Sequence, residues 1–404
     1  MKLMTKEDIM RTAFRVWSRD LYQTTSLNAL AEALHVSKPA IYRHFKNKQA
    51  IIQAMYDYFF DNYASALLPD YKHALQVGSS TEQYALMARA VVRFYLRDSD
   101  AFVFALIKVY ANRHINNTER YLLERGIDIQ ILQAPDKTGE YPSANHLIIA
   151  TIIFLLACFH KQWYETGTLP SDEVIQHFMT FVEGRIAHGL NFDTKVVDAL
   201  DYTALENRLV PYMLVEPAEQ EKLLNVVASI VAQCGPWNAS MEAVAQASGL
   251  SKSSLYTHFK NKHDMLSQLF QTECNRIAHH AATSMALSDK PEGKLYLALL
   301  SVIDYLCSRP EILVSVNWLR ARYIDFNSPL SLQFFQFFSG LGCHNHSVLV
   351  AEESNHWIIF LIINTLMRRP ESLQCSPLPI QSIRSLFRFI CLGLDSWAIP
   401  STER

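Results

Sequence analysis

The chain contains one helical motif twice. The segment 26–50 aligns without a gap with the segment 240–264, and twelve of the 25 aligned positions are identical. The agreement is highest where residues 42–48, YRHFKNK, return as residues 256–262, YTHFKNK. The repeat period of 214 residues is too long for the units of a solenoid. The repeat therefore indicates a duplicated domain, and each half of the chain must be able to build the same fold.

The composition favours helices. Among 404 residues there are only 12 glycines and 15 prolines, which leaves little room for a turn-rich β fold. Half of the residues are hydrophobic, enough for a sizeable core, and the length is compatible with two to four domains. Neither an alternation of strands and helices nor a glycine-rich phosphate loop is recognisable. We therefore expect an all-α protein.

Apolar residues at helical spacing, together with capping and breaking residues, place the individual helices. Thr5 and Asp8 form a capping box at the start of the first helix. In the first half we expect helices over 5–19, 26–33, from Ser37, from Asn47 through Phe59, and over 81–97, 100–115, 118–132, 145–165 and 171–190. In the second half we expect them over 218–233, 240–247, 251–257, 293–307, 311–325, 328–340, 347–368 and 378–396, with a single helix between 195 and 208.

The repeated motif has helix-turn-helix geometry, because two short helices with a tight turn between them lead into a longer helix. The helix after the turn would enter the major groove of DNA. Small residues in its first turn allow close approach, and Ala40 is placed to touch a thymine methyl group. Tyrosine, histidine and lysine side chains would contact phosphates. The candidate DNA contacts are Ser26, Asn28, Ser37, Lys38, Pro39, Ala40, Tyr42, Arg43, His44 and Lys48 in the first copy, and Ser240, Glu242, Ser251, Lys252, Ser253, Ser254, Tyr256, Thr257, His258 and Lys262 in the second.

The Tyr-x-His-Phe-Lys-Asn-Lys motif after an alanine-rich helix resembles the DNA-binding domain of the tetracycline-repressor (TetR) family. The resemblance covers residues 5–60 and 217–270. It implies an all-α protomer with a small-molecule pocket in its C-terminal helices and a dimer bundle built by its last two long helices. The family often has glycine at two turns that hold Leu21 and His35 here, whereas Gly235 and Gly249 retain it. His35 is therefore expected in a left-handed backbone conformation.

The two motif copies differ in charge. Residues 2–57 hold nine Lys and Arg against five acids, whereas residues 218–264 hold four Lys against four acids. The second copy thus lacks a net positive field that would attract DNA. It either reads DNA weakly or is a copy that no longer binds DNA.

Polar residues that interrupt apolar helices, and histidine–tryptophan pairs, are the candidates for effector contacts: Lys108, Asn112, His160, Trp163, Asn317, Trp318 and Arg320. Such positions are more often plain core, and this alternative stays open.

The rest of the chain suggests no cofactor, metal or catalytic site. The segment 343–346, CHNH, lacks the second pair of ligands that a zinc site needs. The irregular cysteine spacing without a CxxC pair fits reduced thiols in the cytoplasm, where we expect the protein. The longest apolar run, 147–159, is too short to span a bilayer. No nucleophile–base pair or carboxylate pair stands at a recognisable spacing, so an enzyme is not expected.

These observations predict five segments: 1–60 and 218–270 as DNA-binding domains, 61–192 and 271–404 as helical regulatory domains, and 193–217 as a linker. The expected function is a transcriptional regulator, a repressor that an apolar or amphipathic small molecule releases from double-stranded DNA. We expect the two halves of one chain to pair as a pseudo-dimer, with a homodimer as the alternative. The competing function is a ligand-binding or protein-interaction module whose heads no longer read DNA.

Overall fold

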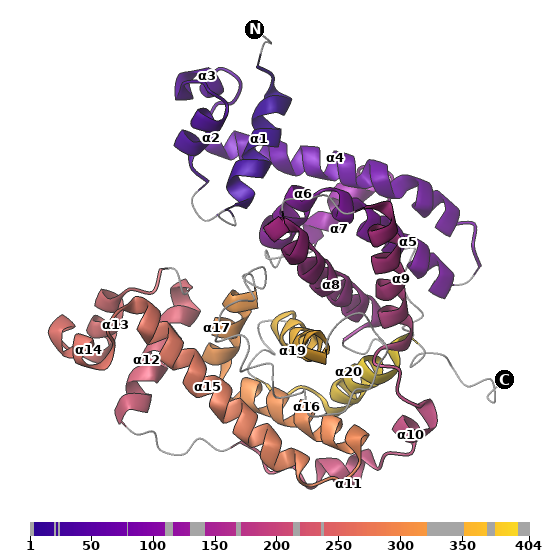
Figure 1. Cartoon of the computed structure of the whole chain (residues 1–404), viewed down its shortest axis with the longest axis vertical. Helices are drawn as coiled ribbons and strands as arrows, with labels where there is room; N and C mark the ends of the chain where they lie inside the picture. Colours follow the sequence, from indigo (N-terminus) through magenta and orange to yellow (C-terminus); the bar gives the residue numbers. More distant parts are fainter. Residues whose placement is uncertain are drawn as a thin grey trace. The chain divides into compact units, whose positions relative to one another are not determined.

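The computed structural model describes residues 4–19, 22, 25–78, 80–109, 116–129, 142–166, 171–212, 219–235, 238–320, 351–369 and 376–394 (Figure 1). These residues form helices joined by turns, and no strand occurs among them. The all-α expectation is confirmed. The chain folds into two compact units. Unit 1 comprises Met1–Lys137 and Cys158–Thr180, and unit 2 comprises Thr138–Ala157 and Phe181–Arg404.

Unit 1 begins with a small head of three helices. α1 (Lys6–Ser18) starts at the capping box that the sequence predicts, with Thr5 accepting a hydrogen bond from the Asp8 amide at 3.1 Å. It packs on α2 (Leu27–Ala33), and α3 (Lys38–Tyr42) follows after a tight turn. The remaining helices of the first repeat are α4 (Lys48–Ala74), α5 (Ser80–Arg97), α6 (Ser99–Phe104), the π-helix η1 (Ala105–Val109), α7 (Asn116–Leu123), α8 (Ala144–Thr166) and α9 (Asp172–His188).

The second repeat lies in unit 2 and follows the same order. α12 (Glu219–Cys234), α13 (Met241–Ser248) and α14 (Lys252–His258) form its head, and α15 (Lys262–Met285) leads into the core. The following helices are α16 (Pro291–Ser308), α17 (Pro310–Arg320), α19 (Ala351–Met367) and α20 (Ile380–Leu392). Two short helices, α10 (Thr194–Asp198) and α11 (Tyr202–Glu206), precede this head.

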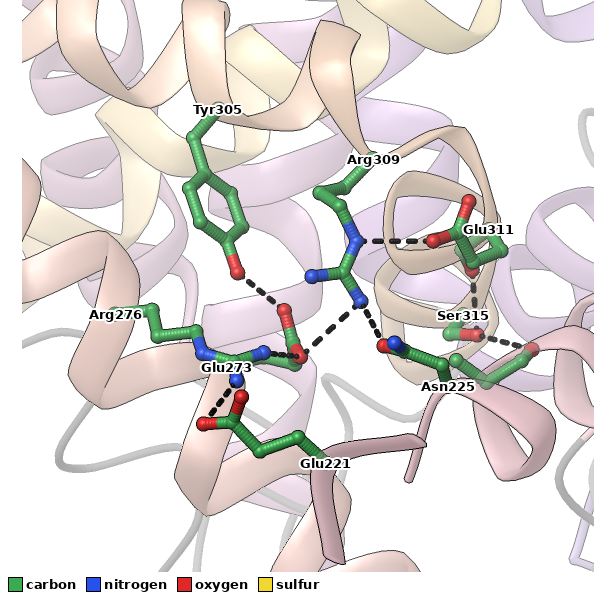
Figure 2. A network of polar contacts seen from close by, with 9 residues as sticks. Glu221, Asn225, Glu273, Arg276, Tyr305, Arg309, Glu311 and Ser315 are labelled. Carbon is green, nitrogen blue, oxygen red and sulfur yellow. Dashed lines mark hydrogen bonds and ion pairs between the residues drawn. The ribbon is translucent and has the colours of Figure 1, made fainter. Parts of the chain in front are cut away.

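A buried network of polar side chains joins the second head to its core (Figure 2). Glu273 on α15 is 1 % exposed and accepts hydrogen bonds from Tyr305 and from Arg276 at 2.9 Å. Arg309, at the end of α16, is 2 % exposed and donates to Glu311 at 2.9 Å and to Asn225 on α12 at 2.7 Å. The network therefore holds α12, α15, α16 and the start of α17 together through charges that are removed from water.

Unit 2 also contains contacts between the end of the first repeat and the end of the second. The indole of Trp357 on α19 donates to the Thr151 hydroxyl on α8 at 3.1 Å, and both residues are buried. The Arg185 guanidinium on α9 lies 5.0 Å from the ring centroid of Trp357. After α9, the Leu190 amide donates to the Ile390 carbonyl on α20 at 2.8 Å. These contacts build one core from α8, α9, α19 and α20, within the residues assigned to unit 2.

Most of the expected helices are present, with two corrections. The segment 195–208 forms two short helices instead of one, because Asp201 caps a new helix by accepting a hydrogen bond from the Ala204 amide at 2.9 Å. The expected helix 118–132 ends earlier, at Leu123, followed by a turn in which Gly126 has a φ of 81°. The expected helix 328–340 and the segment 343–346 lie outside the described residues. Among the described residues, no helix combines the length and the apolar character that a membrane crossing requires.

Candidate nucleic-acid interface

The short helix α3 presents basic and aromatic side chains on the surface of the first head. Ser37 is its N-cap residue in extended backbone, and Pro39 lies in its first turn, where a missing amide hydrogen costs nothing. Lys38, Pro39, Arg43 and Tyr42 are exposed, Tyr42 to 45 %. Such exposure of a large aromatic residue beside two cations is what a phosphate-contacting surface requires.

Ala40 does not lie on this surface. Its side chain is 7 % exposed, because it faces the core of the head together with Ile41 and Phe45. The expected contact of Ala40 with a thymine methyl group is therefore not supported by its orientation. Phe45 has the packing role expected of it, and the ammonium group of Lys6 lies 5.6 Å from its ring centroid.

The turn between α2 and α3 contains the left-handed residue that the sequence predicts. His35 has a φ of 54°, and Gly249 at the same place in the second head has a φ of 70°. A residue that carries a side chain is strained in this left-handed backbone conformation, whereas glycine is not. At the preceding glycine position of the repeat, Leu21 lies outside the described residues, and the adjacent Tyr22 has a φ of 58°.

In each head the helix that follows the repeated motif begins at a capping asparagine. Asn47 caps α4 by accepting a hydrogen bond from the Ala50 amide at 2.8 Å, and Asn261 caps α15 in the same way at 2.9 Å. Lys48 is the first residue of α4 and is exposed, a position that suits phosphate binding. In the second head the residue at the position of Ala50 is Asp264. Its pKa is lowered, mainly by a hydrogen bond from the Lys260 amide, so a negative charge stands where a phosphate would approach.

The two reading surfaces differ most at one pair of positions. In the second head Glu242 on α13 forms an exposed ion pair with Lys252, the first residue of α14. The hydrogen bond between them raises the pKa of Lys252 and lowers that of Glu242, so both side chains stay charged. In the first head the corresponding residues are Asn28 and Lys38, and Asn28 carries no charge. Lys38 therefore has no acidic neighbour at this position, whereas Lys252 has one.

Several candidate DNA contacts also have a structural role. Ser26, Ser240 and Ser251 are N-cap residues whose hydroxyl groups accept hydrogen bonds from helix amides at 3.1 to 3.3 Å. Ser251 also exchanges hydrogen bonds with the hydroxyl groups of Ser253 and Ser254, both at 2.8 Å. The Thr257 hydroxyl donates to the Ser254 carbonyl at 2.6 Å. The remaining candidates are exposed or half-buried: His44, Tyr256, His258 and Lys262.

The structure describes the side chains of two of the seven candidate effector residues, His160 and Lys108. His160 is buried, its Nε2 lies 2.7 Å from the Tyr95 carbonyl oxygen, and its ring is stacked on Phe102 at 4.8 Å. This environment fits a core residue. The ammonium group of Lys108 lies 5.6 Å from the centroid of the Tyr22 ring. Asn112 lies outside the described residues, and the side chains of Trp163, Asn317, Trp318 and Arg320 are likewise not described.

Unit 1 contains a cavity that the sequence analysis did not predict. Its volume is about 420 Å³, and it lies between α1, α4, α5 and α6. Aromatic rings, two carboxylates and one guanidinium group line it, with Asn62 and Ala101 beside them: Phe14, Tyr58, Phe59, Phe94, Asp98, Asp100 and Arg11. None of the predicted effector residues belongs to this lining. No local sequence signal marks it, because its lining residues come from four helices.

Both heads match a known protein family. A family model described as "Bacterial regulatory proteins, tetR family" matches residues 9–55 and again residues 224–269. The uncharacterized HTH-type transcriptional regulator YvkB of Bacillus subtilis (strain 168) is 26 % identical over 210 residues, which make up 50 % of this chain and 92 % of YvkB. The solved structure of the fatty acid degradation regulator FadR from Bacillus halodurans covers 44 % of this chain and 97 % of its own, with a TM-score of 0.36 and 15 % identity.

The helix-turn-helix geometry of both heads defines a DNA-binding transcriptional regulator. The double match shows that the geometry and the family agree in each half of the chain. Two segments of the chain, residues 9–55 and 224–269, match the tetR-family model, so the DNA-binding domain of that family occurs here in tandem.

Proposed function

We propose that this regulator is a repressor that binds an asymmetric operator with two unequal heads of one chain and that a small molecule releases it. The observation that carries the asymmetry is the ion pair between Glu242 and Lys252, which has no counterpart at Asn28 and Lys38. Affinity for DNA rests largely on cations that neutralise phosphates. A lysine paired with a carboxylate contributes less of this affinity, so the first head supplies most of the binding.

The contacts with base edges are also expected to be stronger in the first head than in the second. Arg43, one residue after the end of α3, can donate to guanine or to a phosphate. Thr257 stands at the corresponding place, is shorter and uncharged, and already donates to the Ser254 carbonyl. A homodimer presents identical heads to mirrored half-sites. A chain with two different heads is therefore expected to prefer an operator whose halves differ in sequence and in information content.

The contacts at the ends of the two repeats support a pseudo-dimer within one chain. α8 and α9 from the first repeat share a core with α19 and α20 from the second, through Thr151–Trp357 and Arg185–Trp357. Covalent linkage gives these helices an effective concentration in roughly the millimolar range, which favours pairing within the chain. The expected particle in solution is thus a single chain of 46.2 kDa with two heads. A mass twice as large in light scattering at low micromolar concentration would contradict this arrangement.

Selection of binding sites from randomised DNA duplexes tests the proposal. The expected result is an operator with one strong and one weak half, in which each wrong base in the strong half costs about 1–3 kcal/mol. Arg43→Ala should relax the preference in one half only, and the matched Thr257→Ala should change little. A symmetric inverted repeat with equal information in both halves would refute the proposed asymmetry.

The alternative function is a ligand-binding or protein-interaction module without DNA readout. The neutralised reading surface of the second head favours it for that head alone. Salt dependence separates the two functions, because a head that contacts phosphates loses affinity steeply as salt rises. If Lys48→Ala leaves both the affinity and the salt slope unchanged, the first head does not bind DNA through the proposed surface.

A further inference from the structure

The two repeats carry different side chains at one equivalent position in the fold, between the helix that follows the motif and the end of the next helix. α4 and α15 both begin at the lysine that ends the repeated motif, so Phe59 in the first repeat corresponds to Glu273 in the second. α5 and α16 are both 18 residues long. The residue directly after them is Asp98 in the first repeat and Arg309 in the second. Two residues further, Asp100 corresponds to Glu311.

In the second repeat a built-in cation occupies this place (Figure 2). The Arg309 guanidinium lies between the carboxylates of Glu273, at 3.4 Å, and Glu311, at 2.9 Å. Tyr305 donates its hydroxyl hydrogen to Glu273 and is itself fully buried. Arginine, two carboxylates and an aromatic residue thus close the space between the second head and its core.

In the first repeat the corresponding place is the cavity of about 420 Å³. Asp98 replaces the arginine, Asp100 retains a carboxylate, and Phe59 replaces the other carboxylate. Asp98 accepts a hydrogen bond from the Ala101 amide at 2.9 Å, and Asp100 accepts one from the Ser18 hydroxyl at 2.7 Å. Two carboxylate groups offer about eight acceptor positions in total, so most remain available.

The charge of the carboxylates in the cavity is only partly balanced. Within the part of the chain that the structure describes, neither Asp98 nor Asp100 forms an ion pair within 4 Å. Arg11 also lines the cavity, but its guanidinium contacts Glu7 at 2.8 Å and the Tyr58 hydroxyl at 3.2 Å, and its charge lowers the pKa of Asp98 less than burial raises it. Burial raises the pKa of Asp98, as expected for a desolvated carboxylate whose charge is incompletely balanced.

We propose that this cavity binds an organic cation, a protonated amine, amidine or guanidine on an apolar body, in the place that Arg309 fills in the second repeat. A charged hydrogen bond to a carboxylate is stronger than a neutral one, and aromatic faces attract cations. The Phe14, Tyr58, Phe59 and Phe94 side chains supply such rings around Asp98 and Asp100. The volume lies within the range of small-molecule sites.

The cavity suits a regulatory ligand, and this part of the inference rests on the proposed function as an effector-released repressor. Phe14 belongs to α1 of the first head, whereas Phe59, Phe94 and Asp98 belong to the core of the same unit. A bound cation would contact head and core together and favour one arrangement of them. In the second repeat Arg309 already makes these contacts, so the ligand would act on the first head alone.

Calorimetric titration of the full chain with benzamidinium tests the site without DNA. The matched neutral probe is benzamide, which has nearly the same shape. Asp98→Asn removes the charge but keeps a good N-cap residue for α6. Asp57→Asn removes an exposed carboxylate from α4 outside the cavity and controls for the change in net charge. Asp98→Arg introduces a built-in cation, as in the second repeat, and circular dichroism verifies that each variant is folded.

The expected result is binding of one benzamidinium per chain, with affinity at least about tenfold weaker for benzamide and for Asp98→Asn. Asp57→Asn should bind like the original chain, and Asp98→Arg should not bind. Equal affinity for benzamide, an unchanged affinity in Asp98→Asn, or no binding of benzamidinium at millimolar concentration would overturn the inference. Operator binding without ligand is measured separately, and its absence would refute the proposed function while leaving the calorimetric result valid.

Discussion

Gly189 and Gly393 lie backbone against backbone, each directly after a helix that ends its part of the bundle. A Cβ atom on Gly189 would lie 2.7 Å from the Gly393 nitrogen and 2.5 Å from the Ile390 carbonyl oxygen. A Cβ atom on Gly393 would lie 2.5 Å from the Ala187 carbonyl oxygen. Both residues have positive φ, 55° and 61°. Close approach and backbone conformation therefore both require glycine where α9 meets α20.

Gly189→Ala should lower the free energy of unfolding by about 2 kcal/mol or more, because backbone atoms must move apart and an L-residue must adopt positive φ. The matched control is Gly184→Ala within α9, where a Cβ atom meets nothing within 4 Å. This control should stabilise the chain by about 0.5–1 kcal/mol, since alanine is the better helix former. Urea unfolding measures both. A neutral Gly189→Ala would show that the two segments are not packed as described.

The reading turns allow a reciprocal exchange. His35→Gly should stabilise the first head by about 1 kcal/mol, because it removes the strain of a left-handed side chain. Gly249→Ala should destabilise the second head by about the same amount, although a Cβ atom there meets nothing within 4 Å. Thermal unfolding of the two variants measures the difference. Shifts of the same sign in both would contradict the backbone explanation.

The ion pair on the second reading surface predicts opposite effects of two substitutions. Glu242→Gln frees Lys252 for a phosphate, so affinity for the operator should rise several-fold and the salt dependence should become steeper. Asn28→Glu places a carboxylate beside Lys38 in the first head. It should lower the affinity for the operator by a factor at least as large as the factor by which Glu242→Gln raises it. Fluorescence anisotropy at several salt concentrations measures both. If Glu242→Gln has no effect on affinity, the second head does not contact DNA through this surface.

The buried network of unit 2 predicts strong coupling between two charges. Arg309→Met removes one of the cations that balance the buried charge of Glu273. Glu273→Met likewise removes one of the carboxylates that balance the buried charge of Arg309. Each should cost about 3–5 kcal/mol of stability, whereas the double variant should cost clearly less than the sum. Additive losses in a double-mutant cycle would mean that the two charges do not interact.

His160 predicts a loss of stability in mild acid. Burial lowers its pKa from 6.5 to about 4, so the folded chain keeps it neutral while the unfolded chain protonates it. Unfolding then takes up a proton below pH 6.5, and stability falls as the pH decreases from 6.5 to about 4. The expected contribution between pH 7 and pH 5 is about 2 kcal/mol. His160→Gln can still donate to the Tyr95 carbonyl and should lose this part of the pH dependence in urea unfolding at both pH values.

Features that depend on neighbouring residues could be predicted from the sequence. The capping box of Thr5 and Asp8, the N-caps Asn47 and Asn261 and the left-handed His35 are local, because each involves residues within one helical turn. The repeated motif predicted two reading heads, and the family comparison agrees with both. Helix spacing did not reveal that Asp201 starts a second short helix in the segment 195–208.

Which distant side chains meet became visible only in the folded chain. The sequence pattern did not reveal the cavity, which is lined by Phe14 and Phe59 from two separate helices and by Asp98, which caps a third. Ala40 has the small size that suits a groove, yet the packing of its helix directs it inward. The partners of Glu242 and Glu273 likewise come from other helices. Local patterns specify where helices begin and end, whereas burial and pairing depend on how those helices pack.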